Sequence, residues 1–166
     1  MQLINLLEIY YFSKKYEKHP IVAVVIIFKH KDRILLLKHK NGALKFPGGK
    51  MEMGESILRT LQRELKEELN YSLKEEPELF SIFNYISENK KEQTIFLNFI
   101  YPLSEKPKLS SPEKLKILWL TKEEVIANNV TKDKEFLNRI FKHKRKSKVS
   151  SFDKKLETDI FLCNFQ

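Results

Sequence analysis

Apolar residues along the chain show two patterns, continuous runs and helical spacing, with polar segments between them. Continuous apolar runs, typical of buried strands, predict strands over 21–28, 34–37, 44–46, 79–87, 94–101 and 115–120. Apolar positions at helical spacing predict helices over 3–17, 56–69 and 132–144, and Thr121 is placed to cap a further short helix. Strands thus come before and after one central helix, with more helix at the end. This order predicts an α+β fold in which a mixed β-sheet is sandwiched between α-helices.

The length of 166 residues suggests one domain, which we expect over 1–145 with the N-terminal helix included. Residues 146–166 are expected to form a basic tail whose apolar end, Ile160–Phe165, allows a short strand. The single cysteine, Cys163, excludes an internal disulfide framework and a cysteine-cluster zinc site, and it is compatible with the cytoplasm. Since no stretch has about 18 uncharged apolar residues, we expect no membrane span.

The positive charge is concentrated near the end of the chain. The whole sequence carries a formal charge of +9, and ten basic and three acidic residues lie within 132–155. Such a segment attracts anions such as nucleotides, nucleic acid or acidic lipid. The alternative is a solvated helix end in a lysine-rich protein. We favour the alternative, because no aromatic residue interrupts the run His143–Ser150 as a base-stacking surface would require.

The helix predicted over 56–69 carries two side-chain stripes. An apolar stripe is expected to face the core and consists of Ile57, Leu58, Leu61, Leu65 and Leu69. A second stripe of carboxylates overlaps one edge of it and consists of Glu64, Glu67 and Glu68. Like charges at these spacings destabilise a helix by about 0.2–0.5 kcal/mol per pair, and a hard divalent cation would relieve the repulsion. An acidic face paired with nearby lysines explains the spacing equally well.

The segment before this helix changes that balance. Gly48 and Gly49 follow Pro47 and allow a sharp turn with close approach of the backbone to a ligand. Glu52 and Glu55 add acids near the helix start, and an arginine in the helix could pair with one of them. A Gly-Gly pair alone would indicate no more than a turn.

Together these residues resemble the Nudix box, G-x5-E-x7-R-E-U-x-E-E-x-G-U, where U is a bulky apolar residue. Five residues separate Gly49 from Glu55, and seven more precede the run Arg63-Glu64-Leu65-Lys66-Glu67-Glu68. Two positions depart from the pattern. Asn70 replaces the late glycine, which is plausible because Asn tolerates a left-handed backbone at a helix end, and Tyr71 replaces the last apolar residue. Residues 46–55 also look like the MutT-type branch, which acts on nucleoside triphosphates.

The resemblance implies the Nudix fold and a Mg²⁺-dependent hydrolase, with Mn²⁺ as an alternative cofactor. Such enzymes split a nucleoside diphosphate linked to a group X, here with a nucleoside triphosphate favoured. On this basis Glu64 and Glu68 are expected as main metal ligands, with Glu67 as ligand or general base and the Gly48 carbonyl completing the site. Arg63 and Glu55 are expected to form a structural ion pair. Glu113, in a loop six residues before Trp119, is a second candidate base, or simply an exposed loop acid.

Candidates for substrate binding lie outside the box. Lys38 or His39 could meet a phosphate, Phe46 could stack on a base, and Asn128 or Asn129 could recognise a purine edge. For each of them an ordinary structural role is the default.

Two alternative functions stay open: removal of pyrophosphate from RNA 5′ ends, motivated by the basic segment, and a catalytically silent module that binds a nucleotide. We expect a nucleotide substrate, RNA as a possible partner, no membrane contact, and a monomer or homodimer.

Overall fold

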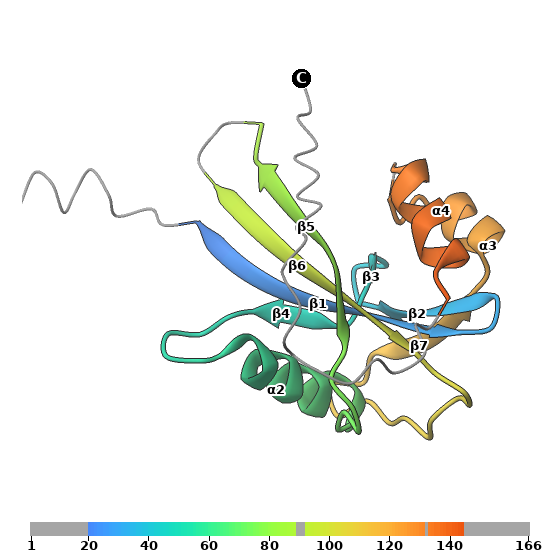
Figure 1. Cartoon of the computed structure of the whole chain (residues 1–166), viewed down its shortest axis with the longest axis horizontal. Coiled ribbons are helices and arrows are strands. Elements are labelled where there is room, and N and C mark those ends of the chain that lie inside the picture. The colour runs from blue at the N-terminus through green and yellow to red at the C-terminus, as the bar shows by residue number, and fades with distance from the viewer. Residues whose placement is uncertain (1–19, 89–91, 132, 145–166) are drawn as a thin grey trace, which may run out of the picture.

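The computed structural model describes residues 20–88, 92–131 and 133–144 (Figure 1). The helix expected over 3–17 and the tail expected over 146–166 lie outside these residues, so the ends of the predicted domain stay predictions. The α+β expectation is confirmed for the described part: a mixed sheet lies between helices.

The sheet contains seven strands within the described residues. They are β1 (Ile21–His30), β2 (Arg33–Lys38), β3 (Leu44–Lys45), β4 (Gly48–Lys50), β5 (Glu78–Ile86), β6 (Gln93–Pro102) and β7 (Lys116–Leu120). The main path runs β3-β2-β1-β6-β5, while β4 pairs with β1 and β7 pairs with β2. Only the pairing of β1 with β6 is parallel, which makes the sheet mixed.

Strand β1 organises the sheet because both of its edges are used. One edge pairs with β6 from Ile21 to Lys29. The other edge is divided: β4 occupies Ala23–Val25, and β2 pairs only with Lys29 and His30. The backbone N–H of Ile26 donates to the carbonyl of Pro47 at 2.9 Å, between these two pairings. The Gly-Gly segment is therefore attached directly to the central strand.

This attachment corrects one expectation. The pair Gly48-Gly49 was predicted as part of a sharp turn, whereas Gly48–Lys50 forms strand β4. The predicted strand over 44–46 correspondingly ends at Lys45. Three residues with two glycines carry no strand pattern of their own, and the strand exists because β1 offers it a free edge.

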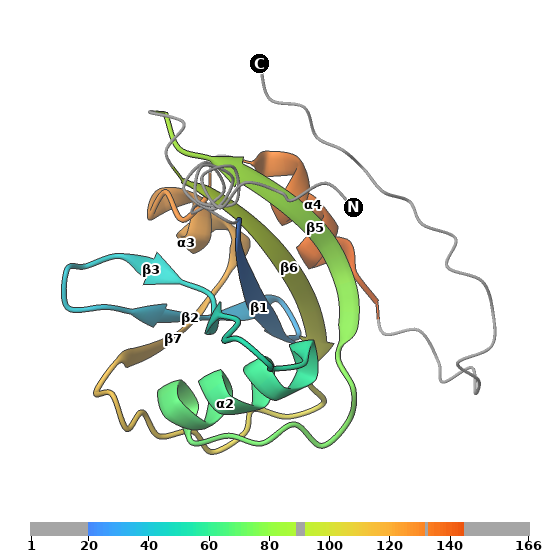
Figure 2. The ribbon, with the colours of Figure 1, turned by 90° about the vertical axis from the view of Figure 1, so that its left-hand side faces the viewer.

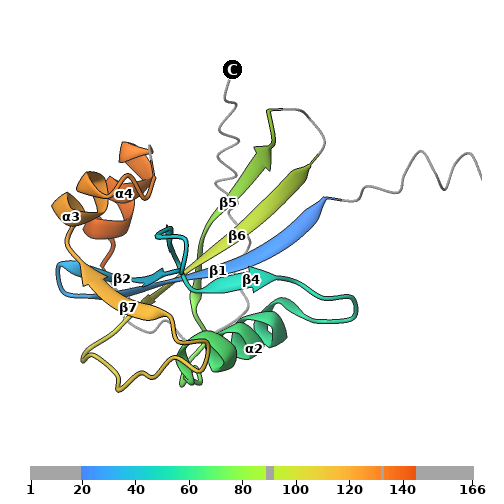
Figure 3. The ribbon, with the colours of Figure 1, turned by 180° about the vertical axis from the view of Figure 1, so that it is seen from behind.

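Three helices are described: α2 (Ile57–Leu69), α3 (Lys122–Ala127) and α4 (Lys134–Lys142). Their start residues follow the capping rules, since Ser56, Thr121 and Asp133 each accept a backbone N–H three residues ahead. Figures 1 and 3 show α2 on one face of the sheet and α3 with α4 on the other, and Figure 2 shows the sheet between them from one end.

Strands β1 and β2 are buried on both faces, which explains their continuous apolar runs. One set of buried residues forms the α2-side core: Val24, Ile26, Phe28, Leu35, Leu37, Leu61, Leu65, Leu69, Tyr71, Phe99 and Tyr101. The other set forms the α3/α4-side core: Ile27, Ile34, Leu36, Ile100, Val125, Leu137 and Ile140. Alternate side chains of one strand thus enter different cores, as the pleat requires.

Candidate active site

Helix α2 carries three of the candidate acids, and both of its ends are fixed. The Ser56 side chain accepts the N–H of Arg59 at 3.3 Å at the start. At the end, Asn70 adopts a left-handed backbone with φ 49° and ψ 40°, and Tyr71 donates its N–H to the carbonyl of Leu65 at 3.1 Å. Asn70 thus fulfils the conformational role expected of the glycine in the motif.

The apolar stripe of α2 is only partly in the core. Leu61, Leu65 and Leu69 are fully buried, but Ile57 and Leu58 are each 38% exposed. The expectation that all five residues face the core is therefore wrong for the first turn. Helical periodicity predicts which face of the helix a side chain is on, but it does not predict how far the sheet extends beneath that face.

Glu68 is buried against the glycine segment, with only 6% of its surface exposed. Its carboxylate accepts the N–H of Gly48 at 2.8 Å. A β-carbon at Gly48 would lie 2.1 Å from the carbonyl oxygen of Val24, and the residue has φ 128°, so only glycine fits here. The missing side chain lets β4 lie against β1, and in that position its N–H meets the carboxylate.

Glu64 lies against Gly49 in the same way. A β-carbon at Gly49 would stand 2.3–2.6 Å from the carboxylate atoms of Glu64. The two glycines therefore bring β4 to within contact of two carboxylates one helical turn apart.

Arg63 connects the loop before α2 to these acids. Its guanidinium makes two bonds to Glu55, at 2.8 and 3.0 Å, and one to the carbonyl of Lys50 at 3.0 Å. A further N–H donates to Glu64 at 2.7 Å, and a longer contact of 3.4 Å reaches Glu67. Glu55 also accepts the Thr60 hydroxyl at 2.9 Å and the Glu52 N–H at 3.1 Å. The loop is thus held to the helix through a charge-assisted, bidentate pair.

The acids of this region have opposite electrostatic environments. The pKa of Glu68 is raised to about 7, chiefly by burial; the Gly48 N–H opposes this rise, and the charges of Glu64, Glu113 and Glu67 contribute to it. Burial also raises the pKa of Glu64 despite its bond to Arg63. In contrast, the bonds from Arg63 and from the Glu52 N–H lower the pKa of Glu55 to about 2. Glu64 and Glu68 are therefore carboxylates whose charge lacks full compensation, whereas Glu55 is fully paired.

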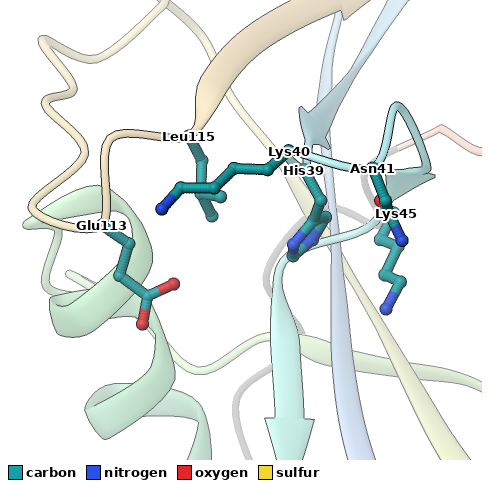
Figure 4. A pocket seen from close by; sticks show the side chains of 6 residues that line it. All are labelled: His39, Lys40, Asn41, Lys45, Glu113 and Leu115. Atoms are coloured by element: carbon teal, nitrogen blue, oxygen red, sulfur yellow. The ribbon is translucent and has the colours of Figure 1, made fainter.

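Glu113 borders the same acids and also lines a pocket. Its charge acts on both Glu64 and Glu68. The pocket has a volume of about 390 Å³, and the residues that line it are His39, Lys40, Asn41, Lys45, Glu113 and Leu115 (Figure 4). Strand pairing brings the segments that line this pocket together, since Lys38 at the end of β2 stands opposite Lys116 of β7 and Leu44 of β3.

The remaining candidates lie elsewhere in the fold. Lys38 is exposed at the end of β2, and Phe46 packs against the α3/α4-side core. Asn128 and Asn129 are exposed at the end of α3, and the side chain of Asn128 donates to the carbonyl of Glu124 at 2.7 Å. The asparagines and Phe46 therefore belong to the side of the sheet opposite α2.

Comparison with known proteins agrees with this geometry. The NUDIX domain family model matches residues 17–140. The chain belongs to the Nudix family. Enzymes of this family hydrolyse phosphoric anhydride bonds.

Two solved Nudix structures illustrate the similarity. The mutator MutT protein from Bacillus halodurans is 31% identical, with a TM-score of 0.61 over 75% of this chain and 84% of that one. The MutT NUDIX hydrolase from Burkholderia pseudomallei is 26% identical, with a TM-score of 0.55 over 64% and 87% of the two chains. A curated relative, the ADP-ribose pyrophosphatase of Methanocaldococcus jannaschii, is 44% identical over 61 residues. That match covers 33% of this chain, and it spans only about a third (36%) of the length of the relative.

The Nudix carboxylates fit a divalent metal in donor type. Hard cations take carboxylate and carbonyl oxygens; Glu68 lies beside the backbone of Gly48, Glu64 lies beside Gly49, and Glu67 is a third carboxylate of the same helix. The raised pKa of buried Glu68 is the imbalance that a cation would relieve. Within the described ranges, however, no three acidic, histidine or cysteine side chains are gathered closely enough to hold an ion by themselves. The helix of this Nudix chain therefore offers ligands and not a closed cage.

Sequence patterns missed four residues that line the pocket together with His39 and Glu113: Lys40, Asn41, Lys45 and Leu115. The run His-Lys-Asn-Gly shows a polar turn, but only the pairing of β2 with β3 and β7 brings this turn opposite Glu113. No helix in the described part of the Nudix chain is both long and apolar enough to cross a membrane.

Proposed function

We propose that this Nudix protein is a Mg²⁺-dependent hydrolase that cleaves a nucleoside diphosphate linked to a group X. The observation that supports this most is the position of Glu64 and Glu68, two carboxylates with raised pKa values packed against the backbone of Gly49 and Gly48. A purely structural acid would be expected to be paired as Glu55 is by Arg63, whereas in the described part of the chain Glu68 is buried with the Gly48 N–H and no cationic side chain beside it. Keeping carboxylates at a site that raises their pKa favours a role in binding a cation.

In this proposal Glu64 and Glu68 are the main ligands, with Glu67 and the Gly48 carbonyl as further ligands, and Mn²⁺ is an alternative to Mg²⁺. When bound, the cation neutralises phosphate charge and acidifies the attacking water. Arg63 keeps Glu64 in place through its 2.7 Å bond while its two bonds to Glu55 fix the loop. The protein thereby positions the ligands before substrate arrives.

The chain's own residues then accept one proton from the attacking water. Water forms a bond to a phosphorus atom, the anhydride P–O bond breaks, and the bridging oxygen leaves with its electron pair. Glu67, which is half exposed and within reach of solvent, accepts the proton of the water, and Glu113 is the second candidate base. The products are a nucleoside monophosphate and phosphorylated X.

We propose a nucleoside triphosphate as the substrate, so that the second product is pyrophosphate. The support is the likeness to a MutT protein at 31% identity over 75% of this chain, against a 61-residue match to an ADP-ribose pyrophosphatase. Lys38 or His39 is the candidate for a phosphate; Phe46, Asn128 and Asn129 lie on the side of the sheet opposite α2, so the proposal does not assign them to the base. A cytoplasmic location is part of the proposal, given the single cysteine.

The test is a turnover screen with Mg²⁺. Wild type, Glu68→Gln and the matched surface variant Glu76→Gln are incubated with nucleoside triphosphates, ADP-ribose, dinucleoside polyphosphates and 5′-triphosphorylated RNA, and products are resolved by ion exchange. We expect turnover of triphosphates by wild type and Glu76→Gln, and at least about a hundredfold loss in Glu68→Gln.

Other outcomes point to the alternatives. Preferred turnover of RNA would replace the triphosphate assignment with the RNA 5′-end activity. Equal turnover by Glu68→Gln and wild type would overturn the metal-ligand role, and tight nucleotide binding without any turnover would favour the silent module.

A further inference from the structure

The pocket beside the acids has a rigid wall made by the turn between β2 and β3. The N–H of His39 donates to the carbonyl of Ala43 at 2.9 Å, and Gly42 returns its N–H to the carbonyl of His39 at 2.9 Å. The Asn41 side chain accepts the N–H of Ala43 at 3.1 Å. Side chains carried by this turn are therefore presented from a fixed backbone, which lowers the entropic cost of binding a ligand.

The lining of the pocket carries two cations and one carboxylate. Lys40 and Lys45 contribute two ammonium groups, His39 an imidazole and Asn41 an amide. Figure 4 shows Lys40 extended across the pocket toward the side where Glu113 stands, with Leu115 close to its stem. Glu113 is the one carboxylate of the lining, and it stands on the side nearest the acids of α2. The ammonium of Lys40 therefore lies on the same side of the pocket as Glu113, whereas Lys45 stands on the other side, beyond His39 (Figure 4).

We propose that this pocket binds the terminal phosphate of the substrate and so selects nucleoside triphosphates over nucleoside diphosphates linked to a neutral sugar. The inference rests on the proposed function, because it assumes that the diphosphate lies over the α2 carboxylates. A triphosphate continues from there as an anion toward the ammonium of Lys40, which stands on the side of the pocket nearest these acids and offsets the charge of Glu113. ADP-ribose ends instead in an uncharged ribose, which gains nothing from the ammonium groups.

The kinetic test compares Lys40→Met with Lys134→Met, because methionine keeps most of the side-chain length without the charge. Lys134 is an exposed residue of α4, on the other side of the sheet. We expect Lys40→Met to lower kcat/KM for a nucleoside triphosphate about tenfold, chiefly through KM. Turnover of ADP-ribose should change by less than about twofold, as should both activities of Lys134→Met. Equal losses on both substrates, or no loss on the triphosphate, would overturn the proposal that this pocket binds the terminal phosphate.

A binding measurement separates this proposal from the proposed function. Inorganic tripolyphosphate is titrated calorimetrically into wild type, Lys40→Met and Lys134→Met in the presence of a chelator, so that no metal or turnover is needed. Weaker binding in Lys40→Met alone supports the pocket even if the protein hydrolyses none of the substrates. Equal binding by all three, together with normal triphosphate hydrolysis, leaves the hydrolase standing and removes the pocket.

Discussion

Gly49 leaves the space that the Glu64 carboxylate occupies: a β-carbon there would lie 2.3–2.6 Å from its atoms. The obstacle is the far end of a flexible side chain, so a Gly49→Ala protein can fold by moving Glu64 aside. We expect its stability to change by less than about 1 kcal/mol and its Mg²⁺ affinity to fall about 10–100-fold, since a ligand displaced from its position binds poorly. Calorimetric Mg²⁺ titration and urea unfolding measure the two effects. Unchanged Mg²⁺ affinity would remove Glu64 from the site.

The neighbouring substitution Gly48→Ala should behave in the opposite way. Its β-carbon would meet the carbonyl oxygen of Val24 at 2.1 Å and the α-carbon of Val25 at 2.9 Å, and these backbone atoms belong to the central strand. The residue also has φ 128°, where side chains are strained. We expect a loss of about 2–4 kcal/mol in the free energy of unfolding, measured in urea beside Gly49→Ala. Stability equal to that of Gly49→Ala would show that β4 can shift away from β1.

Glu55 gives the protein a defined dependence on acid. Its pKa is about 2 in the folded state, lowered by Arg63 and the Glu52 N–H from an ordinary 4.5. Below pH 4.5 the unfolded chain takes up this proton first, so the stability from the pair is complete above pH 4.5 and is lost as the pH falls toward 2. We expect Glu55→Gln to be less stable than wild type at pH 7, with the difference shrinking across this window.

The matched control for this profile is Glu52→Gln, since the Glu52 side chain is exposed and the bond to Glu55 uses its backbone. Thermal unfolding of the three proteins from pH 7 to pH 2 makes the comparison. A gap between wild type and Glu55→Gln that stays constant down to pH 2 would contradict a pKa lowered by Arg63.

Local patterns predicted the parts of this fold that local chemistry decides. The strand over 21–28, the cap at Ser56 and the left-handed Asn70 follow from β-branching, a hydroxyl and a short amide, and all are present. Strand β4 could not be predicted, because it depends on the free edge of β1. Nor could the exposure of Ile57 and Leu58, which depends on how far the sheet extends beneath α2.

The candidate site likewise has features that local sequence decides and features that depend on contacts between distant segments. The spacing of Glu64, Glu67 and Glu68 on one helix face is a local property, and so is the pairing of Glu55 with Arg63. The burial of Glu68 requires contact with Gly48, twenty positions earlier in the chain. The pocket joins Lys40 to Glu113 through the pairing of β2 with β7, which no single segment encodes.

Lys29 ties the central strand to the end of α4, because its ammonium donates to the carbonyls of Phe141 at 2.7 Å and His143 at 2.6 Å. The side chain is buried, and burial lowers its pKa, so these two bonds are what keep a cation there. Lys29→Met removes the donor and leaves the helix-end carbonyls without it, so we expect a loss of about 2 kcal/mol in the free energy of unfolding. Lys142→Met, which removes an exposed charge from the same helix end, should cost less than about 0.5 kcal/mol in the same urea titration. If the two variants lose equal stability, the charge at the helix end matters and the two hydrogen bonds do not.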